Sequence, residues 1–173
     1  NLGYLSKTRS SSYLYDGYLA KFRDNTDNEL VQAVELGYSY HTAYIAYNVN
    51  LYRTSWQNKP INDISIGQDY YARLDGIDQL HQGIEIDFVY KVTKKLELQG
   101  LASLGDWKYQ SKKEGVPYYD QDSDEFAGTF NFDARGVHVG DAAQTQFMGS
   151  LRYEPIKKLY FNLKLIYFDR YFA

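Results

Sequence analysis

The chain of 173 residues contains no cysteine, three prolines and one methionine. Without cysteine it has no disulfide framework, no thiolate metal site and no cysteine nucleophile. Its 19 lysines and arginines are scattered among 22 acidic residues, so no basic stripe indicates a nucleic-acid surface. No segment approaches the roughly 18 consecutive apolar residues of a membrane-spanning helix. A membrane β-strand, however, needs only about 9–11 residues, and every second one faces away from lipid.

Long alternating segments and tyrosine are what the chain has in abundance. It contains 19 tyrosines. Between residues 82 and 92 the odd positions carry Glu85, Asp87 and Lys91. The even positions carry Ile84, Ile86, Phe88, Tyr90 and Val92. Because a helix would mix the two sets around its circumference, the period of two predicts a β-strand with one apolar and one polar face.

The same alternation recurs in residues 33–40, 45–52, 96–104, 145–153 and 159–167. No charged residue interrupts the apolar face of these segments. In a lipid-facing wall this matters, because lysine or arginine at mid-membrane costs about 2–4 kcal/mol. The charged residues of the opposite face are Glu35, Glu85, Asp87, Lys91, Glu97, Arg152 and Lys164. We expect about seven strands, and the polar face suits a wet interior.

Short and long connections alternate between these strands. Tight turns are predicted around residues 41–43, 93–95 and 155–158. Long, polar connections are predicted near residues 6–31, 57–81 and 109–143. This asymmetry is typical of outer-membrane barrels. The sequence therefore favours an all-β fold, an antiparallel up-and-down transmembrane β-barrel with long extracellular loops. A soluble β-sandwich, whose strands also alternate, is the alternative.

Aromatic residues lie near the ends of several expected strands. They include Tyr47, Trp56, Trp107, Tyr109, Tyr153 and Tyr167. In a membrane barrel such residues form girdles at the two interfaces. The alternative for each is an ordinary half-buried aromatic side chain of a strand.

Several of these segments resemble the C-terminal barrel of TonB-dependent receptors, large outer-membrane transporters of Gram-negative bacteria. The stretches "VELGYSYHTAYIAYNVNLYRTSWQNKP" and "GIDQLHQGIEIDFVYKVTKKLELQGLASLGDWKY" resemble two successive late hairpins of that family. "VGDAAQTQ" and "YFDRYFA" resemble the approach to its last strands. The resemblance covers essentially the whole chain, and the order and spacing of the motifs make the combination fairly specific.

The resemblance implies an outer-membrane location and active uptake of a scarce nutrient: a siderophore, cobalamin, a glycan or a peptide. It also implies membrane lipid and the inner-membrane TonB complex as partners, the latter acting through a plug domain. Whether a surface lipoprotein is a further partner is left open by the sequence. The family barrel has about 22 strands. Residues 1–173 are therefore expected to be a partial wall, without the plug, the signal peptide and the remaining strands.

The chemistry of the side chains predicts no enzyme, cofactor or metal site. His41, His81 and His138 are far apart in sequence, and no glycine-rich phosphate loop follows a strand. The acidic run from Asp120 to Glu125 crowds carboxylates that suit calcium, but it lacks the glycine and spacing of a known loop. A solvated loop tip is the better interpretation of this run.

Tyrosines in the long connections are the candidate ligand-binding residues. They are Tyr13, Tyr15, Tyr18, Tyr70, Tyr71, Tyr118 and Tyr119. Tyrosine combines a flat apolar face with a polar tip, which suits ligand capture. The alternative is that these side chains stabilise their own loops. Three functions stay open: active uptake, a passive porin or structural barrel, and a soluble carbohydrate-binding sandwich.

Overall fold

The structure is a computed structural model. It describes residues 1–8, 15–16, 21–22, 27–61, 64–72, 74, 76–140 and 142–172; for 15–16 and 21–22 it describes the backbone alone. Every regular element among these residues is a β-strand. No helix among them has the length and hydrophobicity needed to cross a membrane.

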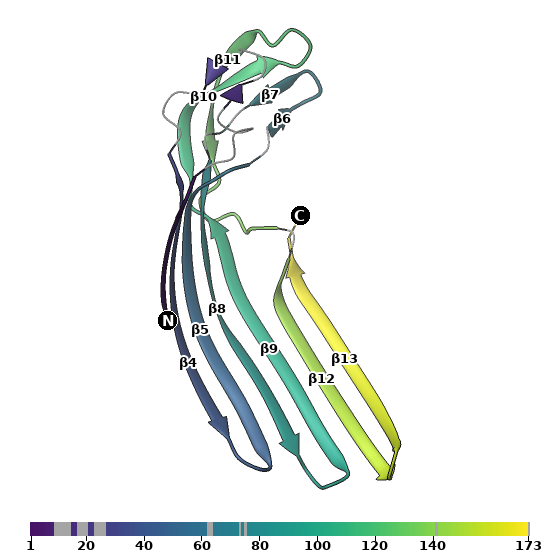
Figure 1. Cartoon of the computed structure of the whole chain (residues 1–173). Helices are drawn as coiled ribbons and strands as arrows, with labels where there is room; N and C mark the ends of the chain where they lie inside the picture. The colour runs from purple at the N-terminus through teal and green to yellow at the C-terminus, as the bar shows by residue number, and fades with distance from the viewer. Residues whose placement is uncertain are drawn as a thin grey trace.

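A seven-stranded antiparallel sheet dominates the structure (Figure 1). Its strands are β1 (Leu2–Lys7), β4 (Glu29–His41), β5 (Ile45–Lys59), β8 (Ile77–Lys91), β9 (Leu96–Tyr109), β12 (Ala143–Ile156) and β13 (Leu159–Tyr171). They lie side by side in this order, so each pairs with the next sheet strand along the chain. The predicted all-β, antiparallel, up-and-down wall is confirmed. The sheet is open rather than closed into a barrel, with β1 and β13 at its edges.

The three predicted tight turns are also confirmed. In two of them a threonine hydroxyl hydrogen-bonds to the backbone of the turn. The Thr42 hydroxyl accepts a hydrogen bond from the Ile45 amide at 3.0 Å. The Thr93 hydroxyl accepts bonds from the Lys95 and Leu96 amides at 3.1 and 3.0 Å. Such bonds from a side chain to the backbone two or three residues on stabilise turns. They fix the registers of the β4–β5 and β8–β9 hairpins.

The long connections contain more regular structure than the sequence predicted. Parts of the segments 57–81 and 109–143 form a four-stranded sheet at the other end of the long strands (Figure 1). Its strands, in spatial order, are β11 (Phe126–Asp133), β10 (Lys112–Asp120), β7 (Tyr70–Ala72) and β6 (Ile64–Ile66). A further short pair joins β2 (Tyr15–Asp16) to β3 (Lys21–Phe22). The long sheet strands also extend into these connections, since β5 continues to Lys59 and β8 begins at Ile77.

The buried hydrophobic core lies in the small sheet and at its junction with the large one. Ala72, Leu74, Ile77 and Val116 are each at most 5% exposed and pack together. The partly buried side chains around them are Ile61, Ile64, Ile66, Tyr109, Tyr118, Phe130 and Phe132. The loop end of the molecule therefore has its own apolar core.

The apolar face of the large sheet stays exposed. Residues in register across it form apolar rows, of which one is Tyr38, Val49, Ile86, Ala102, Phe147 and Tyr167. Leu36 and Leu165 are both 69% exposed, and Phe161 is 58% exposed. A soluble sandwich would bury this face against a second sheet. The four-stranded sheet does not do so, and the described residues therefore do not form the predicted alternative.

The β12–β13 hairpin diverges from β9 toward the loop end (Figure 1). The β9–β12 ladder ends at Leu104 and Thr145. Beyond it, β9 bonds to the segment before β12, where the Val139 amide donates to the Trp107 carbonyl at 2.9 Å. The buried Gln144 side chain fills the branch point: its oxygen accepts from the Trp107 amide at 3.0 Å, and its nitrogen donates to the Trp107 and Val139 carbonyls at 3.1 and 3.0 Å.

Glycine at position 83 permits a close approach on the polar face. Tyr52 lies opposite Gly83, and a Cβ at that position would come within 2.5 Å of the Leu104 carbonyl oxygen and 2.6 Å of the Tyr52 hydroxyl. Gly83→Ala is expected to destabilise the fold by about 1–3 kcal/mol, because the added methyl overpacks against backbone. Equilibrium urea unfolding followed by tryptophan fluorescence measures this difference.

Gly37→Ala is the matched control, because Gly37 lies in β4 on the same polar face of the large sheet as Gly83. Its nearest contact would be the Asn50 side-chain oxygen at an ordinary 3.7 Å. This variant should be neutral or more stable by up to about 1 kcal/mol, because alanine restricts the unfolded chain more than glycine does. Equal destabilisation by both substitutions would show that the close contact at Gly83 is not the cause.

Candidate functional site

Four of the seven candidate tyrosines come together in the small sheet. Strands β7 and β10 are paired, with Tyr119 opposite Tyr71 and Asp120 opposite Tyr70. Tyr13 and Tyr18 lie outside the described residues, and Tyr15 belongs to β2, where only the backbone is described.

Tyr70 and Tyr118 lie on the core side of this sheet. Tyr118 packs against the buried cluster, and its ring meets Tyr70 edge-on at 5.5 Å between centroids. It also lies over Gly128, where a Cβ would approach the Tyr118 hydroxyl to 2.8 Å. Tyr118 therefore serves to stabilise its own loop, and Tyr70 packs on it as a partner. For these two tyrosines, stabilisation of their own loops is therefore a better interpretation than ligand binding.

Tyr71 and Tyr119 lie on the opposite side, where neighbouring strand residues point. Their rings stack at 5.7 Å between centroids with 25° between planes. Phe126, 63% exposed, meets Tyr119 edge-on at 6.3 Å. The Tyr71 hydroxyl donates a hydrogen bond to the Asp124 carboxylate. These three rings, named here the outer aromatic stack, give the loop end an aromatic surface on which a flat apolar group or a sugar ring can pack.

The acidic run next to the stack forms a tight turn. One oxygen of the Asp120 carboxylate accepts hydrogen bonds from the amides of Asp122 and Ser123 at 3.0 and 2.9 Å, and from the Ser123 hydroxyl at 3.0 Å. The bonds from Ser123 and the Asp122 amide lower the pKa of Asp120. Within the described parts of the chain, no group of three or more histidine, aspartate or glutamate side chains is placed to hold a metal ion.

A second aromatic group, which the sequence analysis did not identify as a site, lies on the polar face of the large sheet. The Trp107 indole N–H donates to the Tyr52 hydroxyl at 2.9 Å. The His81 ring stacks on Trp107 at 5.3 Å between centroids. The Trp56 indole N–H donates to the Glu29 carboxylate at 2.6 Å, and Glu29 is only 5% exposed.

This arrangement corrects the expectation for Trp56, Trp107 and Tyr109. They share the polar face with Tyr52 and His81, so they cannot belong to girdles on the apolar face. The signal was present in the sequence, because Trp56 stands four residues after Tyr52 and therefore points to the same side of β5. The girdle interpretation stays a prediction for Tyr47, Tyr153 and Tyr167, which lie on the apolar face.

The polar-face aromatics border an open hollow of about 340 Å³. It is lined by Glu35, Asn50, Tyr52, Thr54, Trp56, His81, Glu85 and Trp107. The lining combines carboxylates and an amide with indole and phenol rings. Such a surface can hydrogen-bond a polar ligand while its rings pack on the ligand's apolar parts.

Comparison with known proteins gives no relative from which a role can be taken. No protein-family model matches the chain, and no curated protein or solved structure matches it either. The resemblance to TonB-dependent receptors therefore stays a prediction.

The turn that ends β11 provides a test of the loop-end electrostatics. Asp133 accepts bonds from the Arg135 amide, Nε and Nη2 at 3.1, 2.9 and 2.6 Å. These bonds lower the pKa of the Asp133 carboxyl from 3.8 to about 2. Because the depressed pKa favours the ionised form, the carboxylate stabilises this turn fully above pH 3.8, and the contribution is lost as the pH falls through about 2.

An NMR titration of the Asp133 carboxyl carbon should therefore show a midpoint near 2. In Arg135→Gln the midpoint should rise toward 3.8, because the guanidinium bonds are lost. A midpoint that is the same in both chains would mean that Arg135 does not hold the carboxylate in solution.

Proposed function

We propose that the chain forms part of the wall of an outer-membrane β-barrel receptor that takes up a scarce nutrient with energy from the TonB complex. The observation that carries the proposal is the apolar face, which stays exposed across a single antiparallel sheet whose other face is polar. In water such a surface would be far larger than the apolar patches of ordinary soluble proteins. Against lipid it is the favoured outer surface of a barrel.

The extent of the apolar face suits a bilayer. On β9 it runs from Leu96 to Leu104, which at strand geometry is about 26 Å and close to the roughly 25 Å apolar band of membrane barrels. At the loop end a polar row replaces it, where Arg53, Gln82 and Asp106 lie in register. Arg53 donates to the Gln82 side-chain oxygen at 3.2 Å.

Clustered tyrosines lie at the turn end of the same face. The Tyr47 ring is 6.1 Å from Tyr38 and 5.4 Å from Tyr40 between centroids. Tyrosine is favoured where hydrocarbon meets water, because its ring is apolar and its hydroxyl is polar. The three rings therefore support an interface at this level of the wall.

The open edges fit a wall that is completed by other strands. Each unpaired backbone group in hydrocarbon costs several kcal/mol, and β13 is exposed along its length. In the proposed receptor, β1 and β13 pair with further strands so that the barrel has no edge. The polar face then lines the interior, where the resemblance implies that a plug domain sits.

The loop end supplies the ligand-binding surface in this proposal. The outer aromatic stack lies at the loop end, and the hollow beside Tyr52 and Trp107 lies on the interior face below it. A ligand captured by the loops would pass from the first surface to the second. The aromatic lining of both fits several nutrient classes, so siderophore, cobalamin, glycan and peptide are all retained.

Cysteine scanning of β8 tests the membrane wall in a background that contains no native cysteine. Ile84→Cys and Ile86→Cys should react slowly with a membrane-impermeant, water-soluble thiol reagent, because lipid covers them. Glu85→Cys and Asp87→Cys should react readily from the wet interior. Labelling rates that do not alternate with period two would contradict the proposal.

Epitope insertion tests the orientation of the wall. An epitope placed between Gln121 and Asp122, in the exposed turn joining β10 and β11, should be reached by antibody on whole cells. The matched insertion at Lys94 should stay unlabelled until the outer membrane is opened. The reverse pattern would place the short turns outside.

A further inference from the structure

Two neighbouring turns gather four lysines at the end of the large sheet opposite the loops. Lys94 and Lys95 belong to the β8–β9 turn, and Lys157 and Lys158 to the β12–β13 turn. The two hairpins are tied together here, because the Lys95 ammonium donates to the Pro155 carbonyl at 2.7 Å and the Glu154 amide donates to the Lys95 carbonyl at 2.8 Å. These four side chains are named the basic turn cluster.

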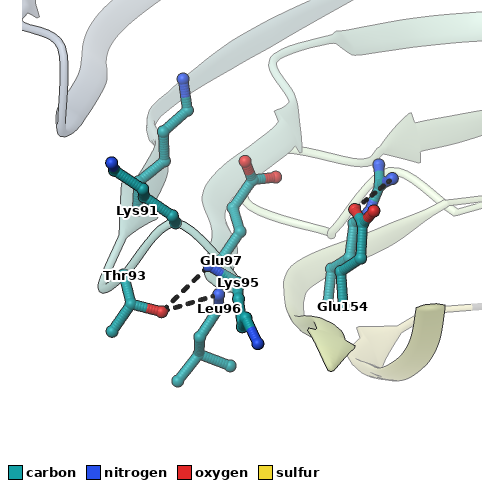
Figure 2. Close-up of a pocket in the computed structure, with 8 residues that line it drawn as sticks. Lys91, Thr93, Lys95, Leu96, Glu97 and Glu154 are labelled. Atoms are coloured by element: carbon teal, nitrogen blue, oxygen red, sulfur yellow. Dashed lines mark hydrogen bonds and ion pairs between the residues drawn. The ribbon is translucent and has the colours of Figure 1, made fainter. Parts of the chain in front are cut away.

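Lys94 and Lys95 of the cluster border a hollow of about 170 Å³ between the two hairpins. Figure 2 shows Lys91, Lys95 and Glu97 of one hairpin and Glu154 of the other among the residues that line this hollow. Both carboxylates already have partners: Glu97 accepts from Gln99 at 2.9 Å, and Glu154 lies 3.9 Å from Arg152. Among the described residues, no ion pair includes a lysine of the basic turn cluster. Its positive charge is therefore uncompensated within the described chain.

The basic turn cluster adjoins the end of the apolar face. Ile156 and Leu159, which flank Lys157 and Lys158, are 64% and 45% exposed. Leu96, next to Lys95, lies in register with Tyr153, which is 43% exposed. A dissolved anion or an acidic protein would match the positive charge of the cluster but not the exposed apolar side chains beside it. Uncompensated ammonium groups beside exposed apolar side chains match a bilayer surface, where anionic headgroups lie next to hydrocarbon.

We propose that the basic turn cluster binds the phosphate groups of anionic phospholipids in the leaflet that surrounds the short turns. The inference rests on the proposed function, since it needs the apolar face to contact lipid. The ammonium groups donate hydrogen bonds to phosphate oxygens, and the flanking isoleucine and leucine contact the acyl chains. Each lysine near an anionic surface contributes roughly fivefold in affinity, and salt weakens this contribution.

The test compares spin-labelled phosphatidylglycerol with spin-labelled phosphatidylcholine around the full chain, reconstituted in phosphatidylcholine bilayers. Electron paramagnetic resonance gives the fraction of each lipid held at the protein surface. The unchanged chain should prefer phosphatidylglycerol, and Lys157→Gln/Lys158→Gln should reduce that preference about fivefold or more. The matched control is Lys112→Gln/Lys113→Gln, which removes an adjacent pair of lysines from β10 in the small sheet and should leave the preference unchanged.

Each other outcome has a defined meaning. If the chain inserts but holds both lipids equally, or if both double variants lose the preference alike, this inference is overturned and the proposed function stands. If inorganic phosphate removes the preference while chloride at equal ionic strength does not, the cluster is a site for free phosphate rather than for lipid. If Ile84→Cys and Ile86→Cys react with a membrane-impermeant thiol reagent as readily as Glu85→Cys in the same bilayers, the proposed function fails and this inference fails with it.

Discussion

Register between neighbouring strands is the constraint on which the rest of the structure depends. A slip of one residue between β5 and β8 would carry Glu85 and Asp87 onto the apolar face, since successive side chains point to opposite sides. The same register sets Tyr52 opposite Gly83, the residue that leaves room for the phenol ring. The ladder irregularities of the large sheet lie near strand ends, between Trp56 and Lys59 and between Tyr153 and Ile156. The apolar rows between them are therefore continuous.

The long strands could be predicted from the sequence because their signal is local. A period of two maintained over many residues indicates an extended strand, and two of the three tight turns contain a threonine whose hydroxyl stabilises the turn. The small sheet gave no such signal. Its strands β6 and β7 have three residues each, and β10 contains a bulge between Lys113 and Val116 that interrupts the alternation. Its core comes from tertiary packing between segments far apart in the chain.

The sequence predicted which tyrosines could form the candidate site, but not how their side chains are arranged. Tyr70 and Tyr71 are adjacent in sequence, and only the strand conformation of β7 sends one to the core and the other to the outer aromatic stack. The hollow beside Trp107 depends on β5, β8 and β9 being neighbours. It also depends on which face of its strand each residue occupies. Trp56 and Tyr52 are four residues apart in one strand, so their common face could have been predicted from the sequence. Which residues of different strands lie close together depends on strand order and register, and could not be predicted in that way.

Gln144 has a mechanical consequence for the sheet. Its side-chain amide takes the place of a backbone peptide group, satisfying Trp107 and Val139 where the β9–β12 ladder stops. The β12–β13 hairpin pairs with β9 along the ladder from Leu96 to Leu104. At the branch it is connected to β9 by the Gln144 amide and by Arg170, which donates to the Gly105 carbonyl at 3.0 Å. A force that separates the hairpin from β9 at the branch would act on these side-chain bonds first. Displacement of the loop segment at Val139 would reach the hairpin through the Gln144 side chain, so the wall and the loops share this branch point.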